Sequence, residues 1–310
     1  MKTIGLYGAP NINQLLEQVV DGKYIVKHLK NGVEGTSSFF NRIARAVSFA
    51  LAVLQVDVVY FTYIEQRTGF YAKIAKLLGK KVVYHWAGTD VLNYLNHPDW
   101  LNNWHPKVDM HLAYAPNLQN ELKILGIESR VFTIVPKLKL ESASMPQKHA
   151  VLLSIPDDKP GLAEFYGYET MIKVIEEFPD LEFVVVRSSH PEKYPYQNVR
   201  HMGVLAWDEM EKVYNNISIV IRYPVHDGLS LLLMESTIKG KYMLYRYELP
   251  YTIHVSSFED ICTELRKLID TPPEVNTEAS KYGIKVYNQD TCLEELTQFL
   301  EPLWKKRGGE

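Results

Sequence analysis

Two carboxylates, Asp227 and Glu235, stand in one short segment, HDGLSLLLMESTIKGKYML (residues 226–244). Asp227 precedes a glycine in a loop-like stretch, whereas Glu235 lies inside a run of leucine and methionine. Burying an unpaired carboxylate in apolar surroundings costs several kcal/mol. Glu235 therefore needs a partner, which is either a group of the protein itself or a bound ligand, and both alternatives are open at this point.

The order of elements around these carboxylates indicates which ligand would fit. A strand-like run, ISIVIRYP, ends just before the loop, and a helical pattern follows it. A helix that begins here would direct the free N–H groups of Gly228, Leu229 and Ser230 towards an anion such as a phosphate. Glu235 would lie about one helical turn further along. There its carboxylate would accept hydrogen bonds from the vicinal hydroxyls of a ribose, which would offset the cost of burial.

Short apolar runs alternate with helical patterns along the whole chain, which predicts an α/β protein with parallel sheets. In the first half we expect strands at Thr3–Tyr7, Val56–Tyr63, Lys81–His85 and Arg130–Val135. In the second half we expect them at residues 150–156, 181–187, 217–224 and 241–247. The pattern predicts two Rossmann-like, doubly wound domains that face a central cleft.

The polar stretch KLKLESASMPQKH has no periodicity and contains a proline, which is typical of a linker. We therefore expect an N-terminal domain over residues 1–138, a linker over 139–148 and a second domain over 149–290. The last helix, residues 291–310, is expected to pack back on the first domain. In open sheets of this kind, ligands bind outside the carboxyl ends of the strands.

Composition and charge exclude several classes of function. The chain has 310 residues and a net charge of −3, which gives no broad positive surface for nucleic acid. Its two cysteines have no metal-binding or redox spacing, which favours a reducing cytoplasm. The N-terminus lacks the apolar core of a signal peptide. We expect a cytoplasmic protein.

The helical pattern near residues 36–54 allows a peripheral membrane contact. Phe39 and Phe40 are followed by Arg42 and Arg45, a combination that interfacial helices share. Such a helix would hold the protein at the inner face of the membrane. The alternative is an ordinary helix of the first domain.

The spacing of Asp227 and Glu235 resembles the acidic-x7-acidic signature of retaining GT-B glycosyltransferases of family four. Two longer segments, LGKKVVYHWAGTDV and EFYGYETMIKVIEEFPDLEFVVV, are similar to the strand-then-His segment and the opening of the second domain in that family. The resemblance implies a hexosyltransferase-like enzyme of glycan biosynthesis. It would transfer a sugar from a nucleoside diphosphate sugar to a glycan, lipid-linked or small-molecule acceptor, with retention. The acidic pair Asp157-Asp158 lies in a turn between two prolines, and we expect no catalytic metal and no further cofactor.

The resemblance also implies roles for individual residues. His85 would contact the donor sugar, Asp227 would address the sugar and the phosphate, and Glu235 would hold the ribose. The family usually has a Lys-Gly pair and an Arg to neutralise the diphosphate, but this chain has Tyr166-Gly167 and no Arg at those positions. Three other basic residues are candidates to replace them, namely Lys159, Arg187 and Arg222.

Two alternatives to a transferase fit the same features. A sugar-nucleotide epimerase or hydrolase of the same fold would consume the donor without an acceptor. A catalytically inactive nucleotide-sugar-binding protein would bind the nucleotide and turn over no donor, and the missing Lys-Gly pair and Arg fit that alternative.

Overall fold

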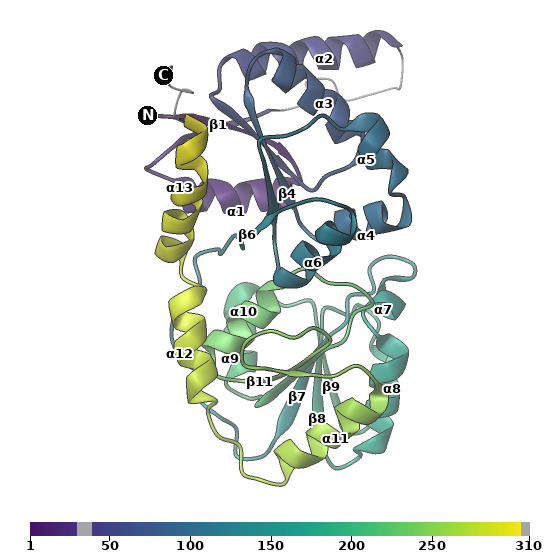
Figure 1. Cartoon of the computed structure of the whole chain (residues 1–310). Coiled ribbons are helices and arrows are strands. Elements are labelled where there is room, and N and C mark those ends of the chain that lie inside the picture. The colour runs from purple at the N-terminus through teal and green to yellow at the C-terminus, as the bar shows by residue number, and fades with distance from the viewer. Residues whose placement is uncertain (30–38, 305–310) are drawn as a thin grey trace. The chain divides into compact units, whose positions relative to one another are not determined.

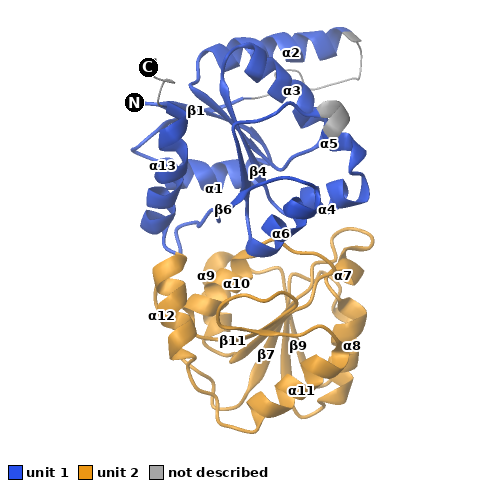
Figure 2. Cartoon of the chain, in the orientation of Figure 1, with its two compact units in different colours: residues 1–138, 288–310 blue, residues 139–287 orange. Residues whose placement is uncertain are grey.

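The computed structural model describes residues 1–29 and 39–304 of the chain. The chain forms two compact units, shown in different colours in Figure 2. Unit 1 contains residues 1–138 together with 288–310, and unit 2 contains residues 139–287. Each unit is built around its own six-stranded sheet with flanking helices (Figure 1).

The sheet of unit 1 has the strand order β2-β1-β3-β4-β5-β6, and all its neighbouring strands are parallel. Its strands are β1 (Thr3–Gly8), β2 (Ile25–His28), β3 (Val58–Thr62), β4 (Lys81–Trp86), β5 (Met110–Ala113) and β6 (Arg130–Val131). Its helices are α1 (Pro10–Val20), α2 (Phe39–Leu54), α3 (Gln66–Leu77), α4 (Thr89–Asn96), α5 (Asp99–Trp104), α6 (Pro116–Ile124) and α13 (Gln289–Trp304).

The sheet of unit 2 has the strand order β12-β11-β10-β7-β8-β9 and is also parallel throughout. Its strands are β7 (Ala150–Ser154), β8 (Glu182–Val186), β9 (Val199–Gly203), β10 (Ile219–Arg222), β11 (Tyr242–Tyr245) and β12 (Thr252–His254). Its helices are α7 (Leu162–Phe165), α8 (Tyr168–Glu177), the 3-10 helix η1 (Pro191–Lys193), α9 (Trp207–Tyr214), α10 (Leu231–Ile238), α11 (Phe258–Ile269) and α12 (Thr277–Val286).

The C-terminal helix α13 is part of unit 1, where it packs against α1. The Trp304 ring lies 5.9 Å from the Tyr24 ring, centroid to centroid. The Arg130 guanidinium lies 5.5 Å from the centroid of the Phe299 ring, a favourable cation–π distance. The chain thus leaves unit 1 after Leu138 and returns to it at Asn288.

The prediction of two doubly wound parallel sheets is confirmed. The predicted strand 130–135 was too long, because pairing with β5 ends at Val131. Four strands were not predicted, namely β2, β5, β9 and β12. Three of them are at or near sheet edges and only partly buried, so they lack a continuous apolar run. In the part of the chain that the structure describes, no helix has both the length and the apolar character to span a membrane.

Candidate functional site

The strand order of unit 2 creates a switch point between β10 and β7. From β7 the chain proceeds to β8 on one side, and it later reaches β10 on the other side. The loops that follow β7 and β10 therefore diverge, and such a point is where open α/β sheets bind ligands. Lys159 lies in the loop after β7, and Asp227 lies in the loop after β10.

Arg222 and Asp227 form a buried ion pair at this edge of the sheet. The Arg222 Nε and a terminal nitrogen donate to the two Asp227 carboxylate oxygens at 2.5 and 2.8 Å. The side chains are only 6% and 11% exposed. Arg222 was expected to face a diphosphate, but the structure directs its charge to the carboxylate five residues further along. The two predicted site residues therefore neutralise each other.

Two tyrosines complete the surroundings of this pair. The Tyr245 hydroxyl donates to Asp227 Oδ2 at 3.0 Å and lies 2.9 Å from the Gly228 carbonyl oxygen. The Arg222 guanidinium lies 5.1 Å from the centroid of the Tyr166 ring. Burial by itself lowers the pKa of Arg222, but the charge and hydrogen bonds of Asp227 outweigh this effect and raise it. Arg222 thus carries a permanent charge that the protein itself compensates.

Gly167 allows the chain to bring Tyr166 close to the loop after β10. Its φ of 81° lies in the left-handed region. A Cβ atom at this position would lie 2.5 Å from the Tyr223 carbonyl oxygen. The Val225 N–H also donates to the Phe165 carbonyl at 2.7 Å. A glycine is therefore required here for backbone packing, even though the lysine of the family pattern is replaced by tyrosine.

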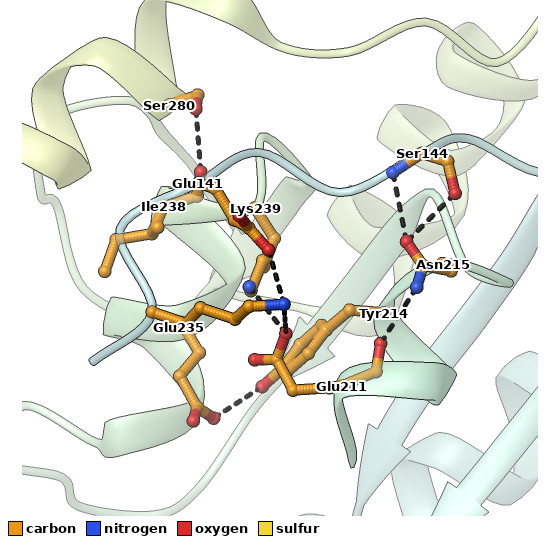
Figure 3. A network of polar contacts seen from close by, with 10 residues as sticks. Glu141, Ser144, Glu211, Tyr214, Asn215, Glu235, Ile238, Lys239 and Ser280 are labelled. Atoms are coloured by element: carbon orange, nitrogen blue, oxygen red, sulfur yellow. Dashed lines mark hydrogen bonds and ion pairs between the residues drawn. The ribbon is translucent and has the colours of Figure 1, made fainter. Parts of the chain in front are cut away.

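Glu235 lies on α10 and is buried, with 8% of its surface exposed. Tyr214 on α9 donates a hydrogen bond to its Oε2 at 2.7 Å (Figure 3). Nearby, Lys239 is paired with Glu211 at 2.7 Å. Burial raises the pKa of Glu235 to about 7, although the Tyr214 hydrogen bond lowers it. The single hydrogen bond from Tyr214 thus offsets only part of the cost of burying the Glu235 carboxylate. The carboxylate can therefore accept hydrogen bonds from a second partner.

The raised pKa of Glu235 predicts a specific pH dependence of stability. The folded protein keeps the Glu235 proton up to about pH 7, whereas the unfolded chain releases it near the ordinary value of 4.5. The free energy of unfolding should therefore fall as pH rises between these values, by at most roughly 3 kcal/mol. Glu235→Gln, which cannot ionise, should gain stability over the parent between pH 5 and pH 8 in thermal unfolding. Parallel pH profiles for the two proteins would contradict this assignment.

The helix that carries Glu235 begins at the predicted place. Ser230 caps α10, and its hydroxyl accepts a hydrogen bond from the Leu233 N–H at 3.2 Å. Gly228 and Leu229 lie in the loop immediately before this cap. The cap satisfies one of the helix N–H groups, and the first turn of α10 remains the place where an anion would meet the helix dipole.

Arg187 and Lys159 are the predicted basic residues that are exposed. Arg187 follows β8 directly and has a φ of 68°, which is uncommon for a residue other than glycine. Since β7 separates β8 from β10, Arg187 leaves the sheet two strand spacings, or roughly 10 Å, from Arg222. Lys159 lines a hollow of about 310 Å³ together with Asp157, Gly161 and Lys193.

His85 is enclosed in the core of unit 1. It is the penultimate residue of β4 and is 1% exposed. Its Nε2 donates to the Phe132 carbonyl at 2.8 Å, and its Nδ1 accepts from the Tyr60 hydroxyl at 3.0 Å. Burial lowers its pKa to about 4, against the effect of the Phe132 hydrogen bond. Both ring nitrogens are therefore hydrogen-bonded within unit 1. Contact of His85 with a donor sugar stays a prediction, and this geometry does not favour it.

Unit 1 contains a hollow of about 500 Å³ at the carboxyl ends of β1 and β3. Gly8 and Asn13 line one part of it, and Glu65 and Arg67 line another. Asn13 accepts a hydrogen bond from the Thr62 hydroxyl at 2.7 Å. A Cβ on Gly8 would lie 1.7 Å from the Thr62 carbonyl oxygen, so only glycine fits there. The lining combines polar and apolar side chains, which suits a ligand with both hydroxyl groups and apolar faces.

The tyrosines of the unit 2 site are not among the residues predicted from the sequence. Tyr214 is 21 residues from Glu235, and Tyr245 is 18 residues from Asp227. Neither spacing forms a motif, because each contact depends on which strands and helices become neighbours. The sequence placed Tyr245 only within the predicted strand 241–247, and the structure shows that this strand lies beside the one that carries Arg222.

The fold, but not the sequence, matches known proteins. No protein-family model matches the chain, and a sequence search of characterised proteins finds no match. A sucrose-phosphate synthase from Thermosynechococcus elongatus superposes with a TM-score of 0.71 at 11% identity, covering 98% of this chain and 99% of that one. The lipopolysaccharide outer core galactosyltransferase WaaB in its apo form gives 0.69 at 12% identity, covering 96% and 98%.

A third similar structure is a UDP-GlcNAc 2-epimerase from Neisseria meningitidis bound to UDP-GlcNAc. It gives a TM-score of 0.57 at 14% identity and covers 97% of this chain and 99% of that one. Together these structures show that the chain has the GT-B glycosyltransferase fold.

Proposed function

We propose that the protein is a glycosyltransferase that moves a sugar from a nucleoside diphosphate sugar to an acceptor with retention of configuration. The observation that carries this proposal is the buried carboxylate of Glu235, one turn inside a helix that begins at the switch point of the unit 2 sheet. Its partly compensated charge suits the two hydroxyls of a ribose. The similar GT-B structures support a donor of this class.

In this proposal unit 2 binds the donor. Glu235 accepts hydrogen bonds from the ribose, and the backbone N–H groups from Gly228 to Ser230 bind the phosphates. Asp227, fixed by Arg222 and Tyr245, faces the donor sugar. Positive charge for the departing diphosphate comes from Arg187 or Lys159, since the protein already neutralises Arg222. The hollow of unit 1, which includes the Gly8 to Asn13 segment, takes the acceptor.

Binding of a nucleoside diphosphate tests the role of Glu235. We expect Glu235→Ala to weaken binding by roughly 1–3 kcal/mol, the range for loss of hydrogen bonds to a charged group. Glu235→Gln should retain more affinity. Glu278→Ala is the matched control in unit 2, since that carboxylate is 66% exposed. Calorimetric titration checks the expectation, and equal affinity in the Glu235→Ala and Glu278→Ala variants would make Glu235 a purely structural residue.

The similarity to an epimerase structure supports a second candidate function, conversion of the nucleotide sugar itself. An epimerase or hydrolase would convert the nucleotide sugar when no acceptor is present, whereas a transferase needs the acceptor. Product analysis by mass spectrometry and NMR, with and without a panel of sugar acceptors, separates these functions. A protein that binds nucleotide but converts no donor under either condition would be a binding protein instead.

Metal dependence gives a further test of the mechanism. We expect donor turnover to persist in excess chelator, because helix N–H groups and basic side chains would stabilise the diphosphate. In the described part of the chain, no cluster of three or more His, Cys, Asp or Glu residues could hold a metal ion. Loss of activity in chelator, restored by magnesium or manganese, would contradict this mechanism.

A further inference from the structure

Helix α2 of unit 1 presents an apolar face to solvent. Four apolar residues lie three or four positions apart along one side of the helix, and each is 47–58% exposed. They are Ile43, Val47, Leu51 and Leu54. We call these four residues the α2 stripe. A row of large apolar side chains on a surface helix is typical of a site that binds another protein or a membrane.

The opposite side of α2 already anchors the helix to unit 1. Phe49 and Val53 are fully buried there. The Phe49 ring lies 4.8 Å from the ring of Tyr71 on α3 and 5.5 Å from the ring of Tyr7, centroid to centroid. The α2 stripe therefore contributes nothing to the core packing that these rings provide.

Helix α3 packs against α2 (Figure 1) and also has exposed apolar side chains. Its exposed side carries Phe70, 51% exposed, and Leu77, 86% exposed. Arg67 and Lys73 lie on the same side of α3, at helical spacing with these two residues. Apolar and basic side chains thus alternate along one face.

The charge of this region is opposite to that of the whole chain. Helices α2 and α3 carry five basic residues, although the complete chain has a net charge of −3. Two of the five are paired within the protein, Arg67 with Glu65 and Lys76 with Asp109, and the other three are Arg42, Arg45 and Lys73. The helices α2 and α3 themselves contain no Asp or Glu. Exposed apolar side chains flanked by Arg and Lys suit a surface with an apolar interior and anionic head groups.

We propose that the exposed faces of α2 and α3 bind to the surface of an anionic lipid bilayer. The apolar side chains would enter the boundary between head groups and acyl chains, while Arg42 and Lys73 would contact the head groups. Residues 36–38, which also belonged to the membrane contact predicted from sequence, lie outside the described residues.

Vesicle sedimentation tests this proposal without any nucleotide or acceptor, so its outcome is separate from that of the proposed transfer reaction. The parent protein should bind vesicles of equal parts phosphatidylcholine and phosphatidylglycerol, and bind phosphatidylcholine vesicles far less. Val47→Asp/Leu51→Asp should reduce binding to the anionic vesicles roughly tenfold or more. Ile124→Asp/Val204→Asp is the matched control, since both positions are highly exposed outside this face, at 78% and 73%.

The basic residues have a separate readout. Arg42→Glu/Lys73→Glu should weaken binding to anionic vesicles and reduce its dependence on salt. The proposal is overturned if the parent does not bind the anionic vesicles, or if Val47→Asp/Leu51→Asp binds them as the control does. It is also overturned if size-exclusion chromatography shows a parent dimer that this variant dissociates while vesicle binding is unchanged, because the face would then join two copies of the chain.

Discussion

Replacing Asp227 by alanine is expected to lower the free energy of unfolding by about 3–5 kcal/mol, because it leaves the buried Arg222 guanidinium without its counter-charge. The pair has bidentate geometry, and its two side chains are at most 11% exposed. The Tyr166 ring cannot replace a carboxylate as the partner of a buried cation. Urea unfolding followed by circular dichroism measures the change.

A surface ion pair of the same unit provides the control for this prediction. Arg266 and Glu177 are paired, but their side chains are 56% and 43% exposed. Glu177→Ala should therefore cost no more than about 1 kcal/mol. Replacing both buried partners, as in Arg222→Met/Asp227→Leu, should recover much of the stability that Asp227→Ala loses. If Asp227→Ala and Glu177→Ala lower the free energy of unfolding by the same amount, the Arg222–Asp227 pair does not stabilise unit 2 as a buried ion pair should.

Replacing Arg187 by alanine is expected to lower donor turnover about a hundredfold or more, the effect typical of losing one preorganised charge-stabilising group. The structure assigns the Arg222 charge to Asp227, so a departing diphosphate needs another cation. Arg187 is exposed, and its φ of 68° holds the backbone in a conformation that costs energy at the carboxyl end of β8. Arg187→Lys should recover only part of the rate, since an ammonium lacks the planar fork of a guanidinium.

The control for Arg187 is Arg200→Ala on the neighbouring strand β9, where the side chain is 47% exposed and paired with Glu182. Single-turnover rates should match the parent in this variant. If Arg187→Ala also reacts at the parental rate while Lys159→Ala does not, the cation comes from the loop after β7. Parental rates in both variants would contradict a diphosphate site at this edge of the sheet.

The sequence predicted the fold where a strand is a continuous apolar run. The strands β7, β8 and β10 are almost entirely buried, and their runs of valine, leucine and isoleucine are visible in the sequence. The strands β2 and β9 lie at sheet edges and consist of exposed and half-buried residues, so no such run marks them. Pairing with a neighbouring strand creates these elements, and a single sequence does not display that pairing.

The sequence predicted which residues lie at the site only where the order of strands, loops and helices along the chain determines their position. The sequence of strand, loop and helix places Arg222, Asp227 and Glu235 at one edge of a sheet. It does not determine where a side chain points, and so it missed the ion pair between Arg222 and Asp227. It also missed Tyr214, because that contact forms only once α9 and α10 are neighbours.

A structure of the full chain with a bound nucleoside diphosphate tests the central claim most directly. We expect the ribose hydroxyls to lie about 2.5–3.2 Å from the Glu235 carboxylate oxygens, the range for hydrogen bonds. The diphosphate should lie at the first turn of α10, within reach of Arg187 or Lys159. A nucleotide bound in the hollow of unit 1, with Glu235 still bonded only to Tyr214, would contradict the account.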